Sequence, residues 1–183
     1  MNLQGIRIGF VIVIGLMHVL QAQDISQQPS RPVASNRPAP NVEINVHKGK
    51  AKNKTSATGR QETYEFTVTI KNLDGINGHR GMKTELYAIG ENRADHSMYN
   101  VISTKNSTFD LARGASHDFK SDFFYVKYYE NSGMTLGGYL VLVYDKEGSL
   151  VKTKATKSSF DSGIEEIKAA DVSKSSSKAF RLK

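Results

Sequence analysis

The chain has 183 residues, and its 25 lysines and arginines against 18 aspartates and glutamates give a formal net charge of +7. It has no cysteine, which excludes disulfides, thiolate zinc sites and a cysteine nucleophile. A hydrophobic core alone must therefore hold the fold, and the length suits one domain.

An apolar segment near the N-terminus is typical of an export signal. Residues 8–20 are apolar except for His18, and this run is shorter than the ~20 residues that a transmembrane helix needs. Leu20 and Ala22 stand where a signal peptidase reads the positions before its cut. We expect residues 1–22 to be a signal peptide cleaved near Ala22, which makes the mature protein periplasmic or secreted. A retained membrane anchor is the alternative.

The segment after the signal is typical of a spacer. All four prolines lie within residues 29–40, among glutamine and serine and without periodicity. This composition predicts a flexible spacer over residues 23–40. Because proline interrupts strand ladders, its absence from residue 41 onward favours a sheet.

Short segments with a period of two follow the spacer. In residues 62–71, Tyr64, Phe66, Val68 and Ile70 alternate with polar residues, as in a strand with one buried face. The other predicted strands are 42–47, 82–90, 98–104, a short pair within 107–119, 122–129, 138–145 and 149–156. Seven or eight strands with no helical pattern between them predict an all-β antiparallel sandwich domain over residues 41–157.

Two stretches carry a resemblance to a known class of domains. "FDLARGASHDF" (109–119) resembles the mid-domain crossover of bacterial immunoglobulin-like or fibronectin-III-like domains, and "YLVLVYDKEGSLVK" (139–152) resembles their last hairpin. The resemblance implies an immunoglobulin-like β-sandwich and brings no catalytic residue with it, since such folds host many functions. The chain lacks the paired cysteines and the core tryptophan of antibody-type domains.

The C-terminal part has the one helical pattern. Ser162 and Glu165 have capping-box spacing, and Ile164 and Ile167 share one helix face. We expect a short helix within residues 158–172, docked on the domain, and a basic flexible tail over residues 173–183.

The candidate chemical motifs predict no enzyme and no metal site. The turn Asp145–Gly148 has two carboxylates separated by Lys146, whereas calcium needs about six oxygen ligands. It is more typical of a hairpin turn closed by a left-handed glycine. The four histidines outside the signal are scattered, so no metal, cofactor or catalytic group is predicted.

A basic segment lies between the first two strands. Residues 48–60 contain five cations and no acid: Lys48, Lys50, Lys52, Lys54 and Arg60. The segment suits either a solvated loop or a patch for an anionic polysaccharide or membrane surface. Nucleic acid is not expected, because the chain is predicted to be exported and the aromatic residues are not interleaved with the lysines.

The aromatic strands leave one face to be explained. The side chains assigned to it are the candidate binding residues Phe123, Tyr125, Lys127, Tyr129 and Tyr139. The C-terminal helix covers this face through Ile164 and Ile167, or the face binds a protein partner or a second copy, or its tyrosines form a platform for sugars. The sequence thus predicts a non-enzymatic exported interaction or structural module of the cell envelope or extracellular space. The alternative is a carbohydrate-binding module that uses exposed tyrosines.

Overall fold

The computed structural model describes residues 39–170 and 179–182, without the side chains of residues 50–52. By its contacts the chain divides into two units, Met1–Arg37 and Pro38–Lys183, and the described residues belong to the second. The predicted signal peptide, nearly all of the predicted spacer and most of the predicted basic tail lie outside the described residues. No helix in the described part is long and apolar enough to cross a membrane.

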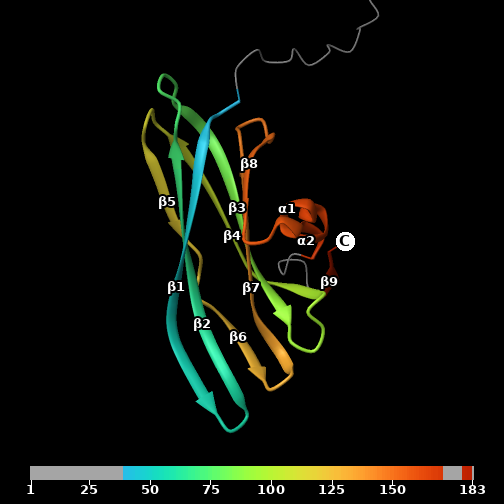
Figure 1. Ribbon diagram of the computed structural model, residues 1–183. Helices are drawn as coiled ribbons and strands as arrows, with labels where there is room; N and C mark the ends of the chain where they lie inside the picture. Colours follow the sequence, from blue (N-terminus) through green and yellow to red (C-terminus); the bar gives the residue numbers. More distant parts are fainter. Residues whose placement is uncertain (1–38, 171–178, 183) are drawn as a thin grey trace, which may run out of the picture. The chain divides into compact units, whose positions relative to one another are not determined.

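The described part of the chain is mostly antiparallel β-structure with two short helices (Figure 1). The strands are β1 (Val42–Ser56), β2 (Gly59–Asn72), β3 (His79–Asn92), β4 (Met98–Leu111), β5 (Ser116–Lys120), β6 (Phe124–Tyr129), β7 (Ser132–Tyr144), β8 (Leu150–Ala155) and β9 (Phe180–Arg181). The helices are α1 (Ser158–Ser162) and α2 (Ile164–Ala169). The predicted all-β antiparallel class is confirmed.

The strands form one curled sheet with two halves. Its order is β1-β2-β6-β7-β3-β4-β9, with β5 beside β2 and β8 beside β7. We call β1, β2, β5 and β6 the first half and β3, β4, β7, β8 and β9 the second half. The halves join at the β6–β7 hairpin, where Tyr128 pairs with Gly133 and Tyr129 with Ser132. Beyond these pairs β7 crosses into the second half and pairs with β3 from Met134 to Tyr144.

Side chains from both halves form a shared inner core. In β2, Tyr64, Phe66, Val68 and Ile70 are buried, as the alternating pattern predicts. The buried members of the inner core are Val42, Ile44, Tyr64, Phe66, Val68, Ile70, Met82, Leu86, Ala88, Phe109, Leu111, Phe124, Val126, Val141 and Val143. The curl of the sheet therefore buries the inward face of each half against the other.

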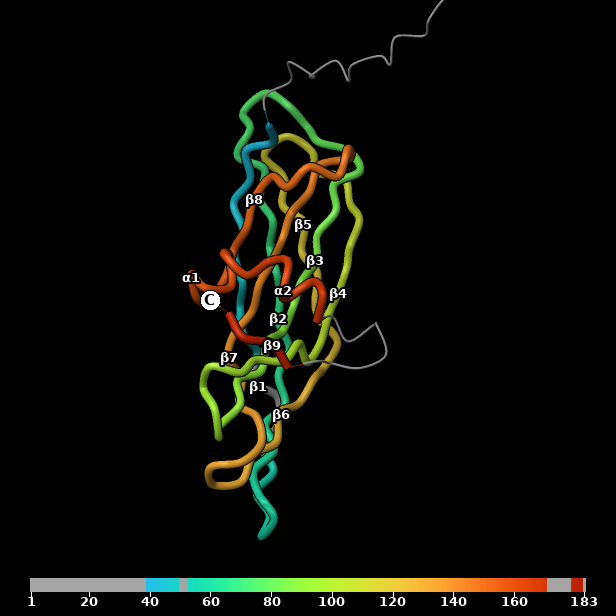
Figure 2. The backbone as a smooth tube through the Cα atoms, turned by 90° about the vertical axis from the view of Figure 1, so that its right-hand side faces the viewer, coloured from blue at the N-terminus to red at the C-terminus, as the bar shows by residue number. Residues whose placement is uncertain are grey.

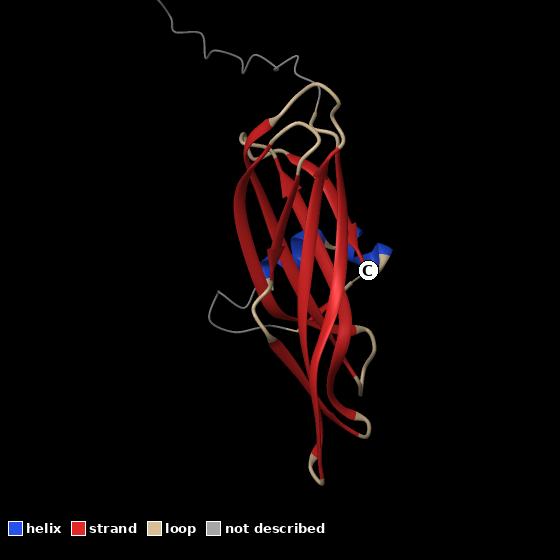
Figure 3. Cartoon of the chain, turned by 90° about the vertical axis from the view of Figure 1, so that its left-hand side faces the viewer, coloured by secondary structure: helices blue, strands red, loops and turns tan. Residues whose placement is uncertain are grey.

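A second core lies between the second half of the sheet and the helices. Its buried members are Tyr87, Ile89, Val101, Leu140, Leu142, Phe160, Ile167 and Ala170. Figure 2 shows α1 and α2 in front of the second half, and Figure 3 shows them behind the strands from the opposite side. The chain's own helices thus cover the face of the second half that carries Leu140 and Leu142, whereas Tyr125 and Tyr129 of the predicted aromatic face are exposed.

This arrangement explains why β7 is apolar on both faces. Val141 and Val143 point into the inner core, whereas Leu140 and Leu142 point toward the helices. A helix or a partner is predicted to cover the side with Tyr139, but the first half of the sheet covers that side. The helices cover the other side, because β7 lies between β3 and β8 in the second half.

The C-terminal helical segment differs from its prediction. It is two short helices interrupted at Gly163, and neither has a side-chain hydrogen bond at its N-cap. Ser162 Oγ donates to the carbonyl oxygen of Ser159 instead of capping a helix. Leu182 packs closely here, since a Cβ on Gly163 would lie 2.1 Å from Leu182 Cδ2. The capping-box prediction is therefore wrong, and the glycine accommodates the end of the chain.

The basic segment is a β-hairpin rather than a solvated loop. β1 continues to Ser56 and pairs with β2 down to Gly59, with a register shift between Lys50 and Asn53. Gly59 has φ 130°, in the region that favours glycine, and a Cβ there would lie 2.7 Å from the carbonyl oxygen of Tyr128. This close approach lets the end of the β1–β2 hairpin lie against β6.

Candidate functional site

The predicted basic and aromatic residues meet at the β1–β2 hairpin and β6. In the register of these three strands, Lys54 is opposite Gln61, and Gln61 is opposite Lys127. Two residues further along, Thr63 is opposite Tyr125. Residues that are distant in sequence thus form one surface, which we call the hairpin-end surface: Lys54, Arg60, Arg93, Tyr125, Lys127, Tyr128 and Tyr129.

The outward face of this surface contains most of the predicted aromatic residues. Tyr125, Lys127 and Tyr129 alternate along β6 and share one side. Tyr125 is 58% exposed and Tyr129 is 49% exposed, and the Nζ of Lys127 lies 5.5 Å from the centre of the Tyr125 ring. Phe123, in the link between β5 and β6, is 68% exposed. This side therefore offers open aromatic rings beside a cation.

Two other predicted residues lie away from this surface. Tyr139 belongs to β7 in the second half, where it packs edge-on against Phe66 with ring centres 5.4 Å apart. Burial raises the pKa of the Tyr139 phenol. The Nζ of Lys48 lies 5.7 Å from the ring centre of Tyr64, a residue of the inner core. The structure thus separates Tyr139 from Tyr125 and Tyr129, because β6 and β7 pair over two residues only.

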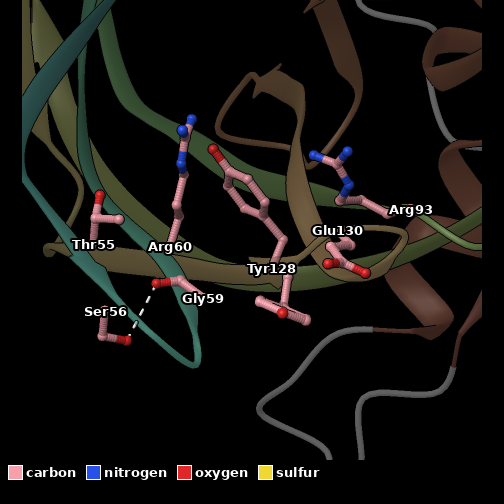
Figure 4. A pocket seen from close by; sticks show the side chains of 8 residues that line it. Thr55, Ser56, Gly59, Arg60, Arg93, Tyr128 and Glu130 are labelled. Carbon is pink, nitrogen blue, oxygen red and sulfur yellow. Dashed lines mark hydrogen bonds between the residues drawn. The ribbon is translucent and has the colours of Figure 1, made fainter.

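The inward face of the same strands forms a hollow of about 390 Å³, shown in Figure 4. It is lined by Thr55, Ser56, Gly59, Arg60, Arg93, Tyr128, Tyr129 and Glu130. Thr55, Arg60 and Tyr128 form one cross-strand row. Arg93 directly follows β3, and its backbone N–H donates to the carbonyl oxygen of Gly133 over 3.1 Å. Both halves of the sheet therefore contribute to the hollow.

Hydrogen bonds and ring contacts hold the hollow in shape. The Tyr128 hydroxyl donates to one oxygen of Glu62 over 3.3 Å, and the Tyr64 hydroxyl donates to the other. Burial, together with this carboxylate, raises the pKa of Tyr64 far above its ordinary value. The Arg93 guanidinium carbon lies 4.9 Å from the ring centre of Tyr128, within cation–π range. The Tyr128 ring is thus fixed at its hydroxyl and on one face.

The cations of the hairpin-end surface are not neutralised within the described part of the chain. No described carboxylate lies within 4.0 Å of the charged nitrogens of Lys54, Arg60, Arg93 or Lys127. Glu130 lines the hollow without forming such an ion pair. The surface therefore has a local excess of positive charge.

A second hollow of about 460 Å³ lies on the other side of the hairpin turn. Its lining includes Lys54, Gln61 and Lys127 together with Thr58 and Tyr129. Both volumes lie within the ~300–1,000 Å³ that is usual for small-ligand sites. The two hollows share the lining residues Ser56, Gly59, Arg60, Tyr128 and Tyr129. They therefore adjoin the same segments of β1, β2 and β6.

Polar clusters elsewhere hold the helices and turns in place. Glu91 binds Lys157 and accepts a 2.7 Å hydrogen bond from the Nδ1 of His96, while Lys168 donates to the Tyr144 hydroxyl over 3.2 Å. The turn after β7 is a glycine-closed hairpin turn, as predicted, with Gly148 at φ 85°. Within residues 39–170 and 179–182, no group of three histidine or carboxylate side chains is placed to hold a metal ion.

Sequence reasoning missed Arg93, Tyr128 and Glu130. Tyr128 continues the inward face of Phe124 and Val126, a position typical of a core residue, and nothing local marks Arg93. A usable signal was present in β2, where Arg60 and Glu62 continue the inward series of Tyr64 and Phe66. Charged residues at inward positions indicate that the face is open there.

Comparison with known proteins does not assign a family. No protein-family model matches the chain, and no curated protein matches it. A Northeast Structural Genomics Consortium target has 9% identity and a TM-score of 0.34, over 62% of this chain and 84% of the other. A crystal structure from Akkermansia muciniphila has 13% identity and a TM-score of 0.34, over 66% of this chain and 73% of the other.

Proposed function

We propose that this protein is an exported, non-enzymatic interaction module that binds an anionic polysaccharide of the cell envelope or extracellular space. The observation that carries the proposal is the meeting of unneutralised cations and exposed tyrosines at the hairpin-end surface. Export is supported by the apolar run at residues 8–20.

The open form of the surface favours a polymer over an enclosed small substrate. Its two hollows lie on either side of a three-strand ribbon, so an extended ligand can contact both. Sugar rings stack on aromatic side chains, and anionic groups are attracted by the guanidinium and ammonium groups. Among the described residues that line the hollows, Glu130 is the one carboxylate and there is no histidine, which supports binding rather than acid–base catalysis.

An apolar protein interface on the second face of the sheet has less support. That face is occupied by α1 and α2 through Phe160 and Ile167, both fully buried. The exposed rings of the first half stand beside Lys127, in a mixed rather than an apolar patch.

The same proposal includes the finer fold type. We propose that the curled sheet is an immunoglobulin-like β-sandwich, as the resemblance in residues 109–119 and 139–152 implies. The inner core shared by the two halves supports this reading.

The test is retention of the mature chain on an anionic matrix during a salt gradient. The surface variant Lys54→Gln/Arg60→Gln/Lys127→Gln should elute at much lower salt than the wild type. The matched control is Lys83→Gln/Lys152→Gln/Lys154→Gln, which removes the same three charges from exposed positions of the second half. Equal loss of retention in both variants would show that only net charge matters and would overturn the proposal.

A further inference from the structure

The hollow in Figure 4 has the features of a selective site rather than of a general basic patch. Arg60 and Arg93 stand on opposite sides of the Tyr128 ring, with Glu130 beside Arg93. The two arginines come from different halves of the sheet, so the fold itself brings them together. A general attraction to negative charge would need no such arrangement.

The parts of the hollow are held in place before any ligand arrives. Glu62 accepts the hydrogen bond from the Tyr128 hydroxyl, and the guanidinium of Arg93 stacks on the same ring. Glu130 has φ 45°, a left-handed conformation that is strained for a residue other than glycine. Side chains that are already ordered lose less entropy on binding, which favours affinity and selectivity.

The chemistry of the lining matches an acidic sugar. Guanidinium groups bind carboxylate or sulfate oxygens through paired N–H donors, which an ammonium group does not offer. The Glu130 carboxylate and the hydroxyls of Thr55 and Ser56 are suited to the hydroxyls of a sugar ring. A bare inorganic anion would use the guanidinium groups but not the carboxylate or the aromatic ring.

The same surface is poorly suited to a lipid membrane. The turn of the β1–β2 hairpin consists of Ala57 and Thr58, so its tip has no large apolar side chain to insert between lipids. Tyr128 is half-buried within the hollow rather than presented at the tip.

We propose that the hollow between Arg60 and Arg93 is the selectivity subsite for an acidic sugar unit, whose carboxylate or sulfate binds the guanidinium groups beside Tyr128. This inference rests on the proposed function and names the chemical group that the subsite selects. Lys54 and Lys127, on the outward face, then supply general attraction along the polymer.

The experiment is calorimetric titration of the mature chain with a galacturonate oligosaccharide, a sulfated dextran and neutral dextran, and a sedimentation assay with phosphatidylglycerol vesicles. Arg60→Gln and Arg93→Gln should each weaken binding of an acidic oligosaccharide about tenfold or more. The controls Lys54→Gln and Lys127→Gln remove the same charge and should weaken it about threefold or less. The ratio of galacturonate to sulfated dextran affinity tells which anionic group the subsite prefers.

A stability measurement and one further variant keep the result interpretable. Arg60 is exposed, so Arg60→Gln should retain the unfolding temperature of the wild type. Arg93→Lys keeps the charge but loses the paired donors, and it should bind more weakly than the wild type. Equal effects of the arginine and lysine variants would overturn the subsite while leaving the proposed function intact. Binding to the vesicles without binding to an acidic oligosaccharide would overturn the choice of ligand.

Discussion

Replacement of Phe160 by alanine tests whether the helices cover the sheet in solution. Phe160 is fully buried in α1, and its ring meets Tyr99 edge-on with ring centres 5.4 Å apart. Truncation of a buried phenylalanine costs about 3–5 kcal/mol of unfolding free energy, which includes the lost ring pair. We expect the upper part of that range, because both the helix and the second half of the sheet lose contacts.

The assay is urea unfolding followed by far-ultraviolet circular dichroism, with the midpoint and slope compared between variants. A loss of about 4–5 kcal/mol is roughly a quarter or more of the ~5–15 kcal/mol that stabilises a typical domain. Ser158→Ala, at an exposed position of the same helix, is the control and should stay within about 0.5 kcal/mol of the wild type. A loss below about 1 kcal/mol for Phe160→Ala would refute the packing of α1 on the sheet.

Three other substitutions test the strain, the acid response and the close packing. Glu130→Gly should raise stability by about 1 kcal/mol, because glycine accepts φ 45° without a steric cost; a lower unfolding temperature would contradict this. The hydrogen bond from Lys157 lowers the pKa of Glu91. The ionised carboxylate therefore stabilises the fold at pH values above the ordinary glutamate pKa of about 4.3, and this stabilisation is lost as the pH falls through and below that value. Glu91→Gln should therefore lose less stability than the wild type between about pH 5 and pH 3, as measured by urea unfolding at each pH, and parallel losses would argue against the ion pair. Gly138→Ala should cost about 2 kcal/mol in the same assay, because φ is 148° and the new Cβ would lie 2.6 Å from Thr156 Cβ; no change would show that β8 moves aside.

The strands could be predicted because their signals are local. The alternation of Tyr64, Phe66, Val68 and Ile70 follows from the two-residue period of a half-buried strand, whatever the partner strand is. The same holds for the turn at Gly148, which its own residues specify. The C-terminal helical segment was located, but its division at Gly163 depends on Leu182 and so on a contact between distant residues.

Strand pairing, in contrast, could not be read from the sequence. Tyr139 follows β6 closely in the chain, and adjacent strands usually pair, so it was placed beside Tyr125 and Tyr129. In the structure, β7 pairs with β6 over two residues and then pairs with β3. This pairing orients the Tyr139 side chain toward the inner core. The identity of the partner strand is a long-range property that local patterns do not encode.

The candidate site was predicted in part for the same reason. Lys54, Arg60, Tyr125, Lys127 and Tyr129 were named from composition and alternation, but the basic and aromatic sets were treated as separate. The pairing of β2 with both β1 and β6 unites them. Arg93 joins through a backbone hydrogen bond to Gly133 near the start of β7, for which the sequence holds no local signal.

The most direct test of the central claim is titration of the mature chain with a galacturonate oligosaccharide at low and high salt, beside the surface variant Lys54→Gln/Arg60→Gln/Lys127→Gln. We expect the wild type to bind with an affinity that falls as salt rises, and the surface variant to lose at least tenfold in affinity at low salt. Binding that is the same in the wild type and the surface variant would contradict the account.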